Sequence, residues 1–511
     1  MALGDKINTL FSIYFIFPLA KVYLYLIRNP KTREYFESNG ILYLGDVSVD
    51  YVKNFIDGIS GTKYWMKVYN RIKQANADLA GCAMAGYNFV LPRNPSLIKA
   101  ILVKDASHFG RVDTLLSLKG DYFVSKSLIF AQGEAWKKTR AKFESAFTPS
   151  KIKQNFDQVN QFGKNLVAYL NRELDRGTKA GINFGLAAHK YTLDVAGSTT
   201  LNLNTGSLQT RGPSHIEQVW GKFFVSFDNF WNWWKPGFIQ WFPRIATYFK
   251  ITLVDKEIVQ FYRHVAKGEM NNSNENEVGD KNNFVQLVHS TWQELYGRHV
   301  DRPDEEEWIA ANLFGMTVPG YQTTPTLISM CAYVLALHQD VQDKLRDEVN
   351  ATFESNGGEF NYAAVSQMSY VDMVINETLR MHSPVGLLGR MCTKEYPVPG
   401  TKYVIKVGDI ILISLYGLHY DEEYHENPQV FNPERFSGVN KDFTFLPFSQ
   451  GLKSCIGIWM VMMQTKMALC HVLRNFRLTP SPDTLIPMKF VNSQVPVMDP
   501  EKVFVNCTKI E

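Results

Sequence analysis

The chain has 511 residues, of which 45% are hydrophobic, 13% are aromatic and 20% are charged, and its formal net charge is +4. These values exclude an intrinsically disordered chain, and 34 glycines and 22 prolines exclude a collagen-like one. The near-neutral charge gives no reason to expect a nucleic-acid partner. The six cysteines are scattered without a CxxC pair, so we expect reduced thiols in a compartment that faces the cytosol, not a disulfide framework.

The N-terminal region begins with a long apolar run. Residues 9–27 are almost wholly apolar, and these nineteen residues approach the length of about 20 that a membrane-spanning helix needs. Pro18 and Lys21 oppose a spanning helix, and the alternative is an amphipathic helix that lies on a bilayer or on the protein itself. Because basic residues follow the run at 28–33, we expect residues 1–30 to form a membrane anchor with the rest of the chain in the cytosol.

Beyond this run the sequence pattern is mainly helical. Apolar residues recur at helical spacing over three segments, 150–175, 309–337 and 330–355. Strand-like runs are few and short: 88–91, 403–405 and 410–413. The residues between the last two runs predict a hairpin turn, and the polar stretch 271–283 predicts a surface loop. The order of these elements predicts a large α-rich protein with small sheets rather than an alternating βαβ fold.

One cysteine has surroundings that suggest chemistry. Cys455 lies in a loop between Gly451 and Gly457, and a long apolar helical pattern starts at Trp459. A thiolate just before a helix start is stabilised by backbone N–H groups and the helix dipole, and glycines let the backbone approach a ligand closely. Such a loop can present a soft, negatively charged ligand to iron. On these residues alone, a structural cysteine at a loop–helix junction is an equal alternative.

The loop belongs to an ordered set of motifs. Its members are Glu377-x-x-Arg380, the segment 431–436, and the string F-x-x-G-x-x-x-C-x-G at Phe448, Gly451, Cys455 and Gly457. This set resembles the cytochrome P450 family, and the segments 392–400 and 418–421 are similar to microsomal animal members, which include xenobiotic-metabolising mammalian and insect enzymes. The resemblance implies a mainly α fold with small β-sheets, a long central oxygen-site helix and a Cys-ligand loop over residues 31–511. It also implies haem b as the cofactor, with Cys455 as the iron ligand.

Three charged residues resemble the buried ion network of this family. Glu377 and Arg380 are three residues apart, so they share a helix face and can pair. The resemblance gives Arg435 the third place in the network, which fixes the haem-binding loop. Without the other motifs, the Glu377–Arg380 pair would be interpreted as an ordinary exposed pair that contributes little to stability.

A set of donors resembles the haem-binding residues of the family. Trp136 and Arg140 are four residues apart, one above the other on a helix, and both are pure donors, which suits a haem propionate. The resemblance gives Arg390 and Lys453 similar roles, although Lys453 lacks the planar fork of the usual arginine. The alternatives are a core Trp136 beside a solvated Arg140, and a Lys453 that faces solvent. The expected cofactor-binding set is completed by Phe448 and Gly457.

The apolar stripe at 309–337 predicts a helix of about thirty residues, close to 45 Å long. On its own, this stripe is typical of a core helix. Its centre, residues 319–324, aligns with the A-G-x-[D/E]-T-T segment of the family's oxygen-activating helix. The resemblance therefore assigns Gly320 to making room over the haem and Thr323 to proton delivery.

Two departures from the family pattern fall in this helix. Gln322 occupies the place of an acidic residue, and an amide can order water but cannot ionise. Pro319 and Pro325 each remove a backbone hydrogen bond, so we expect the helix to be broken where dioxygen would sit. Thr323 favours retained oxygen chemistry, whereas Gln322 argues against efficient proton delivery.

The resemblance implies a membrane-anchored haem-thiolate monooxygenase of the endoplasmic reticulum, with its catalytic domain on the cytosolic side. It would oxidise a lipophilic small molecule with O2 and with NADPH electrons from NADPH-cytochrome P450 reductase, cytochrome b5 being a candidate second partner. No Gly-rich dinucleotide loop follows a strand in this chain, so the reductase would be a separate protein. The aromatic region 220–249 would cap the substrate channel at the membrane, or it would pack in the protein core. The lysines within 137–142 would face an acidic partner protein, or they would face solvent.

Two other functions fit the same residues. An isomerase or dehydratase of the P450 fold that rearranges a peroxide needs neither a reductase nor a proton relay. Gln322 and Pro319 favour this alternative, whereas Thr323 opposes it. A haem-binding protein without catalysis, such as a ligand carrier or sensor, is the other alternative.

Overall fold

The computed structural model describes residues 31–84, 86–110, 120–177, 181–214, 216–221, 235, 238–239, 242–268, 284–297, 304–438, 443–491 and 497–510. The predicted anchor at 1–30, the polar stretch 271–283 and most of the aromatic region 220–249 lie outside these residues. Within the described ranges, no helix combines the length and the apolar character that crossing a membrane requires.

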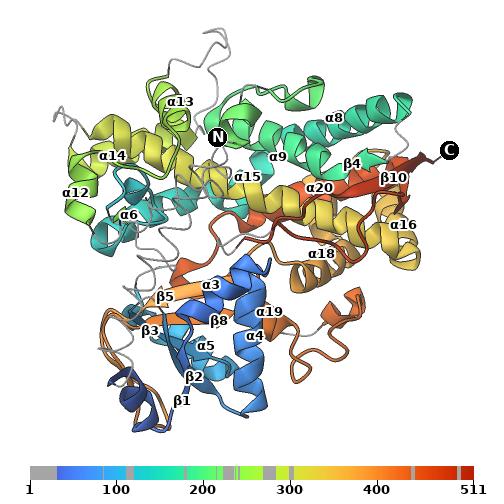
Figure 1. Ribbon diagram of the computed structural model, residues 1–511. Helices are drawn as coiled ribbons and strands as arrows, with labels where there is room; N and C mark the ends of the chain where they lie inside the picture. The colour runs from blue at the N-terminus through green and yellow to red at the C-terminus, as the bar shows by residue number, and fades with distance from the viewer. Residues whose placement is uncertain are drawn as a thin grey trace, which may run out of the picture.

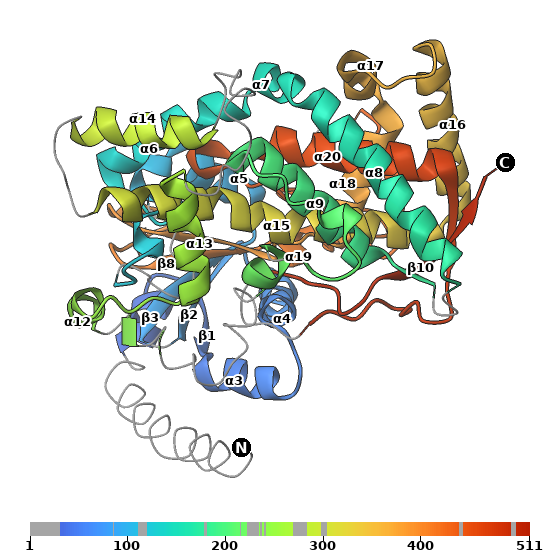
Figure 2. The ribbon, with the colours of Figure 1, turned by 90° about the horizontal axis from the view of Figure 1, so that it is seen from above.

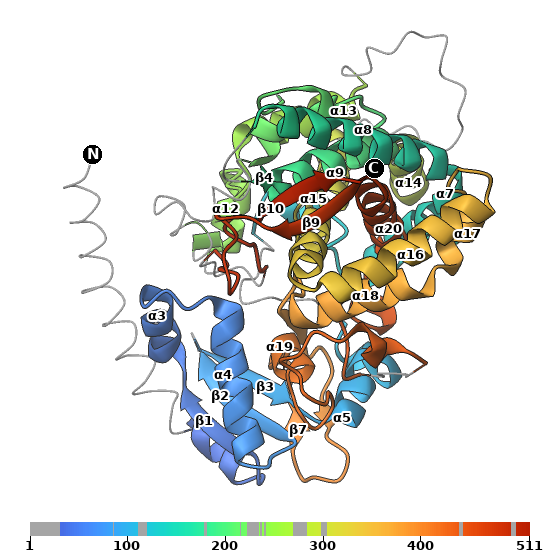
Figure 3. The ribbon, with the colours of Figure 1, turned by 90° about the vertical axis from the view of Figure 1, so that its right-hand side faces the viewer.

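A mixed sheet and the helices that pack on it form the smaller part of the molecule (Figure 3). Its elements are β1 (Leu42–Asp46), α3 (Ser48–Ile56), α4 (Gly61–Gln74), β2 (Leu79–Met84), β3 (Tyr87–Pro92), α5 (Pro95–Lys99), the π-helix η2 (Ala100–Lys104), η3 (Ala106–His108), β5 (Leu387–Met391), β8 (Ile410–Ser414) and α19 (Leu415–His419). The strand order is β1-β2-β3-β8-β5, in which β1–β2 and β3–β8 are parallel and the other two pairs are antiparallel. Trp65 of α4 is fully buried and stacks on Phe89 of β3, so this part has its own apolar core.

The predicted hairpin between 403–405 and 410–413 is wrong. Both runs are strands, but β7 (Val404–Ile405) pairs with β6 (Tyr396–Pro397), whereas β8 pairs with β3 and β5. Every residue of β8 is buried, and a buried strand needs a hydrogen-bonding partner on each edge. The turn that precedes β8 does form, with Gly408 at φ +96°, but it leads the chain from one sheet into another.

The larger part is helical, which confirms the prediction of a mainly α fold with small sheets, and α15 (Glu305–Leu337) runs through its middle (Figures 1 and 2). Helices and strands packed around it include α9 (Phe184–Leu201), α13 (Lys256–Ala266), α14 (Phe284–Tyr296), α18 (Ser369–Met381), α20 (Ile458–Asn475) and β9 (Phe476–Pro480). The other elements are η4 (Val124–Lys126), α6 (Gly133–Glu144), η5 (Ser145–Phe147), α7 (Pro149–Gln154), α8 (Phe156–Asp175), β4 (Ile182–Asn183), η6 (Ser207–Gln209), α12 (Pro243–Tyr248), α16 (Gln339–Ser355), α17 (Tyr362–Gln367), η9 (Pro433–Phe436), η10 (Gly451–Lys453) and β10 (Phe504–Lys509). Strands β4, β10 and β9 form an antiparallel sheet at one end of α15.

The prediction that α15 is broken at its prolines is wrong, because the helix continues through both Pro319 and Pro325. Each proline removes one backbone hydrogen bond. Both large apolar clusters of this part include residues of α15, so packing holds the helix from several sides. The hydroxyl groups of Thr323 and Ser329 donate to the carbonyls of Pro319 and Pro325, at 2.9 Å and 2.6 Å, but the carbonyls that lose an N–H partner are those of Gly315 and Tyr321, so packing holds the helix. The surroundings therefore override the local preference for a break.

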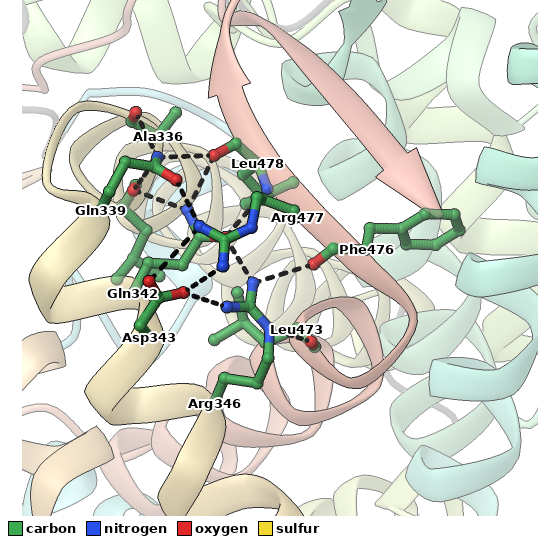
Figure 4. Close-up of polar contacts among 10 residues, drawn as sticks. Ala336, Gln339, Gln342, Asp343, Arg346, Leu473, Phe476, Arg477 and Leu478 are labelled. Carbon is green, nitrogen blue, oxygen red and sulfur yellow. Dashed lines mark hydrogen bonds and ion pairs between the residues drawn. The ribbon is translucent and has the colours of Figure 1, made fainter. Parts of the chain in front are cut away.

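A polar cluster joins the ends of α15, α16 and α20 to β9 (Figure 4). The side-chain amide of Gln342, which is fully buried, makes four hydrogen bonds: it donates to the carbonyls of Leu335 and Leu478 and accepts from the Leu478 N–H and from Arg346. Arg346 donates in turn to the Leu473 carbonyl in the last turn of α20. Because the last carbonyls of a helix have no partner within it, these bonds satisfy groups that burial would otherwise penalise.

Substitution of Gln342 by leucine tests this cluster. The change keeps the size of the side chain and leaves buried backbone groups without partners, so we expect the free energy of unfolding to fall by roughly 2–4 kcal/mol. Denaturation followed by circular dichroism measures this loss. The control is Gln161→Leu at an exposed amide, for which we expect a change of less than about 0.5 kcal/mol.

Candidate active site

Cys455 lies near the end of residues 443–457, called here the Cys455 loop, which leads into α20. The backbone N–H of Cys455 donates to the Phe448 carbonyl at 2.8 Å and so closes the loop on itself. Gly451 has φ +75°, and a Cβ atom at this position would collide with the Leu102 carbonyl of η2. The motif therefore needs glycine here for two reasons: the left-handed backbone and the close approach of η2.

Cys455 is an exposed residue, although protein atoms surround its thiol closely. This desolvation raises the pKa of the thiol, whereas a hydrogen bond from the Gly457 N–H and the charge of Arg140 lower it. A bound metal ion deprotonates a coordinating thiol outright, so the raised pKa of the free thiol does not oppose ligation. Cys455 is the exposed one of the six cysteines, and the other five are buried.

Two arginines fasten the loop from different elements. Arg140 of α6 donates to the Ser454 carbonyl at 2.9 Å and also pairs with Glu144. Arg390 of β5 is buried and donates to the Ser449 hydroxyl at 3.1 Å. The sequence motifs did not single out Ser449, and only its φ of +59°, unusual for a residue other than glycine, marks it in the structure.

Lys453 is turned toward the protein and not into solvent. Its ammonium nitrogen lies over the ring of Trp136 at 3.2 Å from the centroid, in a cation–π contact. Burial, together with the charges of Arg390 and Arg140, lowers the pKa of Lys453 to about 7. The structure therefore brings together four of the predicted cofactor-binding residues at the loop.

Glu377, Arg380 and Arg435 also come together, as the resemblance to the family implied. The two oxygens of the Glu377 carboxylate each accept from Arg380 at 2.8 Å, and one also accepts from the Asn432 N–H at 3.0 Å and from Arg435 at 3.4 Å. Glu377 and Arg380 are fully buried. The exposed-pair alternative is thus excluded for these residues. Arg380 also donates to the His419 carbonyl at 2.9 Å, which the motifs did not indicate.

The central helix α15 is buried along almost its whole length, except for a short stretch of one face near its middle. Within 307–336, every residue is buried except Met316, Pro319, Gly320 and Thr323. These four positions share one helix face, so the helix presents an open stripe in the middle of the protein. A Cβ atom at Gly320 would meet nothing within 4 Å, and the Thr323 hydroxyl donates to the Pro319 carbonyl on the same face.

Gln322 does not share this face. It is buried, 6% exposed, and its position lies about 100° around the helix axis from that of Thr323, beside the stripe and not on it. From their adjacency in the motif, residues 320, 322 and 323 were predicted to form one catalytic group. The structure brings only Gly320 and Thr323 to the open side of the helix.

The residues present fit a haem group. The Cys455 thiol is a soft ligand for iron, and Arg390 and Lys453 have no carboxylate partner among the described residues. Burial lowers the pKa of Arg390 to about 10, which shows how poorly its surroundings compensate its charge. Two carboxylates of a ligand would neutralise this cluster, and the side-chain-free Gly320 leaves space beside α15.

Comparisons with known proteins agree with this site. A family model for Cytochrome P450 matches residues 56–506. Cytochrome P450 3A12 of Canis lupus familiaris is 33% identical over 422 residues, which cover 81% of this chain and 80% of that protein. Cytochrome P450 9e2 of Blattella germanica is 28% identical, covering 84% and 85% of the two chains, and cytochrome P450 6j1 of the same species is 27% identical over 99% of both.

The chain therefore belongs to the cytochrome P450 family, as the motifs indicated. Proteins of this family bind haem b through a cysteine thiolate and act as monooxygenases, so this chain is a haem-dependent oxidoreductase. The relatives fall in the insect and mammalian groups that the segments 392–400 and 418–421 resemble.

Substitution of Glu377 by glutamine tests the ion network. Removing one partner leaves the Arg380 guanidinium buried without compensation, so we expect the free energy of unfolding to fall by about 3–5 kcal/mol. Glu434→Gln is the control, because Glu434 pairs with Lys344 at the surface, where we expect a loss of less than about 1 kcal/mol. Equal losses in the two variants would contradict a special role for the buried network.

Proposed function

We propose that this chain is a monooxygenase that oxidises a lipophilic small molecule with O2 and with electrons that NADPH-cytochrome P450 reductase transfers from NADPH. The observation that carries the proposal is the open stripe of α15, on which Gly320 and Thr323 are two of the four accessible residues. We assign residues 31–511 to the haem domain and residues 1–30 to an anchor in the endoplasmic reticulum membrane, with the haem domain on the cytosolic side.

Residues of the Cys455 loop, of α6 and of β5 hold the cofactor in this proposal. Cys455 is the iron ligand, and Arg140, Arg390, Lys453 and Trp136 are the donors to its two propionates. Phe448 and Gly457 shape the loop around the sulfur. The bound haem supplies activation of O2, which a thiolate ligand favours by donating electron density to iron.

The open stripe of α15 binds the reactants in this proposal. Gly320 carries no side chain, so substrate and O2 can approach the helix at this point. The Thr323 hydroxyl donates to the Pro319 carbonyl, so its oxygen can accept a hydrogen bond from a water molecule, and the hydroxyl can pass on its proton when it turns away from that carbonyl. Gln322 has a structural role, because its amide is buried on another face of the helix.

Surface features favour a lipophilic substrate and contact with a membrane. In and around α12, Phe242, Ile245, Tyr248 and Phe249 are between 46% and 81% exposed, which is uncommon for side chains of this size on a soluble surface. Apolar and aromatic side chains of this kind suit the interface of a bilayer. Lys137 and Lys138 of α6 are exposed on the helix that reaches the Cys455 loop, where an acidic electron-donor protein can dock.

A peroxide-rearranging isomerase or dehydratase is the second candidate, and the burial of Gln322 favours it. An acid on the open stripe would serve proton delivery, and none of the four accessible residues of the stripe is acidic. Such an enzyme would convert a hydroperoxide without NADPH and without a reductase.

The two candidates differ in their need for electrons. We expect purified protein with reductase and NADPH to form product from a lipophilic substrate, and to form none from a hydroperoxide when NADPH is absent.

Cys455→Ser tests the iron ligand. This variant should lose the absorption band that the reduced, carbon-monoxide-bound thiolate form gives. Turnover of a hydroperoxide without NADPH would favour the second candidate, and a thiolate band in Cys455→Ser would refute the ligand assignment.

Thr323→Val tests proton delivery with a nearly isosteric change. We expect product formed per NADPH to fall by at least about tenfold, because the accessible hydroxyl is removed while the size of the side chain is kept. Thr326→Val is the matched control: its hydroxyl donates to the Gln322 carbonyl at 3.0 Å but is buried away from the stripe. The ratio of product to NADPH is measured for both variants, and equal ratios would refute the role of Thr323.

A further inference from the structure

Two buried histidines hold the start of the Cys455 loop. The Leu446 N–H donates to Nε2 of His419 at 3.1 Å, and Nε2 of His425 donates to the Thr444 carbonyl at 3.1 Å. Both side chains are fully buried, and their ring centroids lie 6.5 Å apart. The pair therefore binds one N–H and one carbonyl within three consecutive residues of the loop.

The hydrogen bonds fix different tautomers in the two rings. A backbone N–H can only donate, so Nε2 of His419 accepts, and its proton is on Nδ1, from which it donates to the Arg380 carbonyl at 3.2 Å. A carbonyl can only accept, so His425 carries a proton on Nε2. Burial, His425 and Arg380 lower the pKa of His419 to about 3, so its ring stays neutral and its acceptor persists.

His419 connects the buried ion network to the Cys455 loop. Arg380 donates from its guanidinium to the His419 carbonyl, and the Arg380 carbonyl accepts from the His419 ring. Among the described residues, none of the side-chain hydrogen bonds of Glu377, Arg380 or Arg435 reaches residues 443–457 directly. A hydrogen-bonded path from the network to the loop passes through the His419 ring.

We propose, on the basis of the proposed role of Cys455 as the iron ligand, that His419 and His425 are positioning residues that hold the Cys455 loop in the geometry in which its sulfur ligates iron. The loop needs such support. Phe443 and Ser449 each have φ +59°, a backbone region that is strained for residues with a side chain. Packing adds to the clamp, since the Phe445 ring lies 5.3 Å from that of His419 and 4.7 Å from Phe436 of η9.

A pair of amide substitutions at His419 separates its two hydrogen bonds. Glutamine places its amide oxygen where Nε2 lies, so His419→Gln keeps the acceptor for Leu446 and loses the donor to Arg380. Asparagine reaches only as far as Nδ1, so His419→Asn keeps the donor and loses the acceptor. Both variants replace a ring by a smaller amide, so they share the cost of lost packing.

The readout is the spectrum of the reduced, carbon-monoxide-bound protein, in which thiolate-ligated and thiolate-free haem give separate bands. We expect His419→Gln to keep the ratio of the two bands within about threefold of wild type, and His419→Asn to raise the thiolate-free fraction by about tenfold, the effect of one buried N–H left unpaired. Equal ratios in the two variants would overturn the proposal, because a space-filling histidine would not distinguish them.

Controls separate this proposal from the function that it rests on. His471→Asn changes another buried histidine, whose Nε2 lies 2.7 Å from the Asn160 side chain rather than near the Cys455 loop, and we expect it to leave the ratio unchanged. A wild-type protein without a thiolate band would refute the role of Cys455 itself. If His419→Asn does not fold, hydrogen exchange at Leu446 in wild-type protein decides: we expect strong protection, and exchange as fast as in an open loop would overturn the clamp.

Discussion

The Cys455 loop depends on contacts from outside itself, and much of the fold supplies them. Its backbone has positive φ at Phe443, Ser449 and Gly451, and such a segment persists only where its surroundings fix it. Helix α6 reaches the loop through an arginine, strand β5 through another, and the π-helix η2 through close backbone packing. The sheet part and the helical part thus meet at the residues that present the sulfur.

The central helix meets two opposing demands. It must be buried to support the core on several sides, yet it must leave an accessible face for chemistry. The structure meets both demands with four accessible positions on one face, spread over two turns of a helix that is otherwise buried between residues 307 and 336. A proline is tolerated here because tertiary packing outweighs one lost backbone bond.

Short spacings in the sequence predict only local features. Glu377 and Arg380 are one helical turn apart, so they can pair on one helix face, but their burial, the place of Arg435 and the role of Cys455 were expected from the resemblance to the family. The sequence did not predict features that depend on packing. The two adjacent strand-like runs belong to different sheets. Gln322 lies outside the open stripe, because tertiary packing and not adjacency in the motif decides which helix face is accessible. His419 lies in the segment 418–421 that resembles the family, but its role had no local signal, because both of its ring partners are distant in the chain.

The cluster of Arg390 and Lys453 has a consequence for how this protein exists in a cell. Two basic groups held close together, with no carboxylate partner among the described residues, raise the free energy of the folded chain, and a dianionic haem would remove that cost. Cofactor binding then contributes to folding stability by mass action, in addition to enabling catalysis. The steady-state amount of the protein would follow haem supply, because chains that fold without haem would be degraded in larger proportion by quality control.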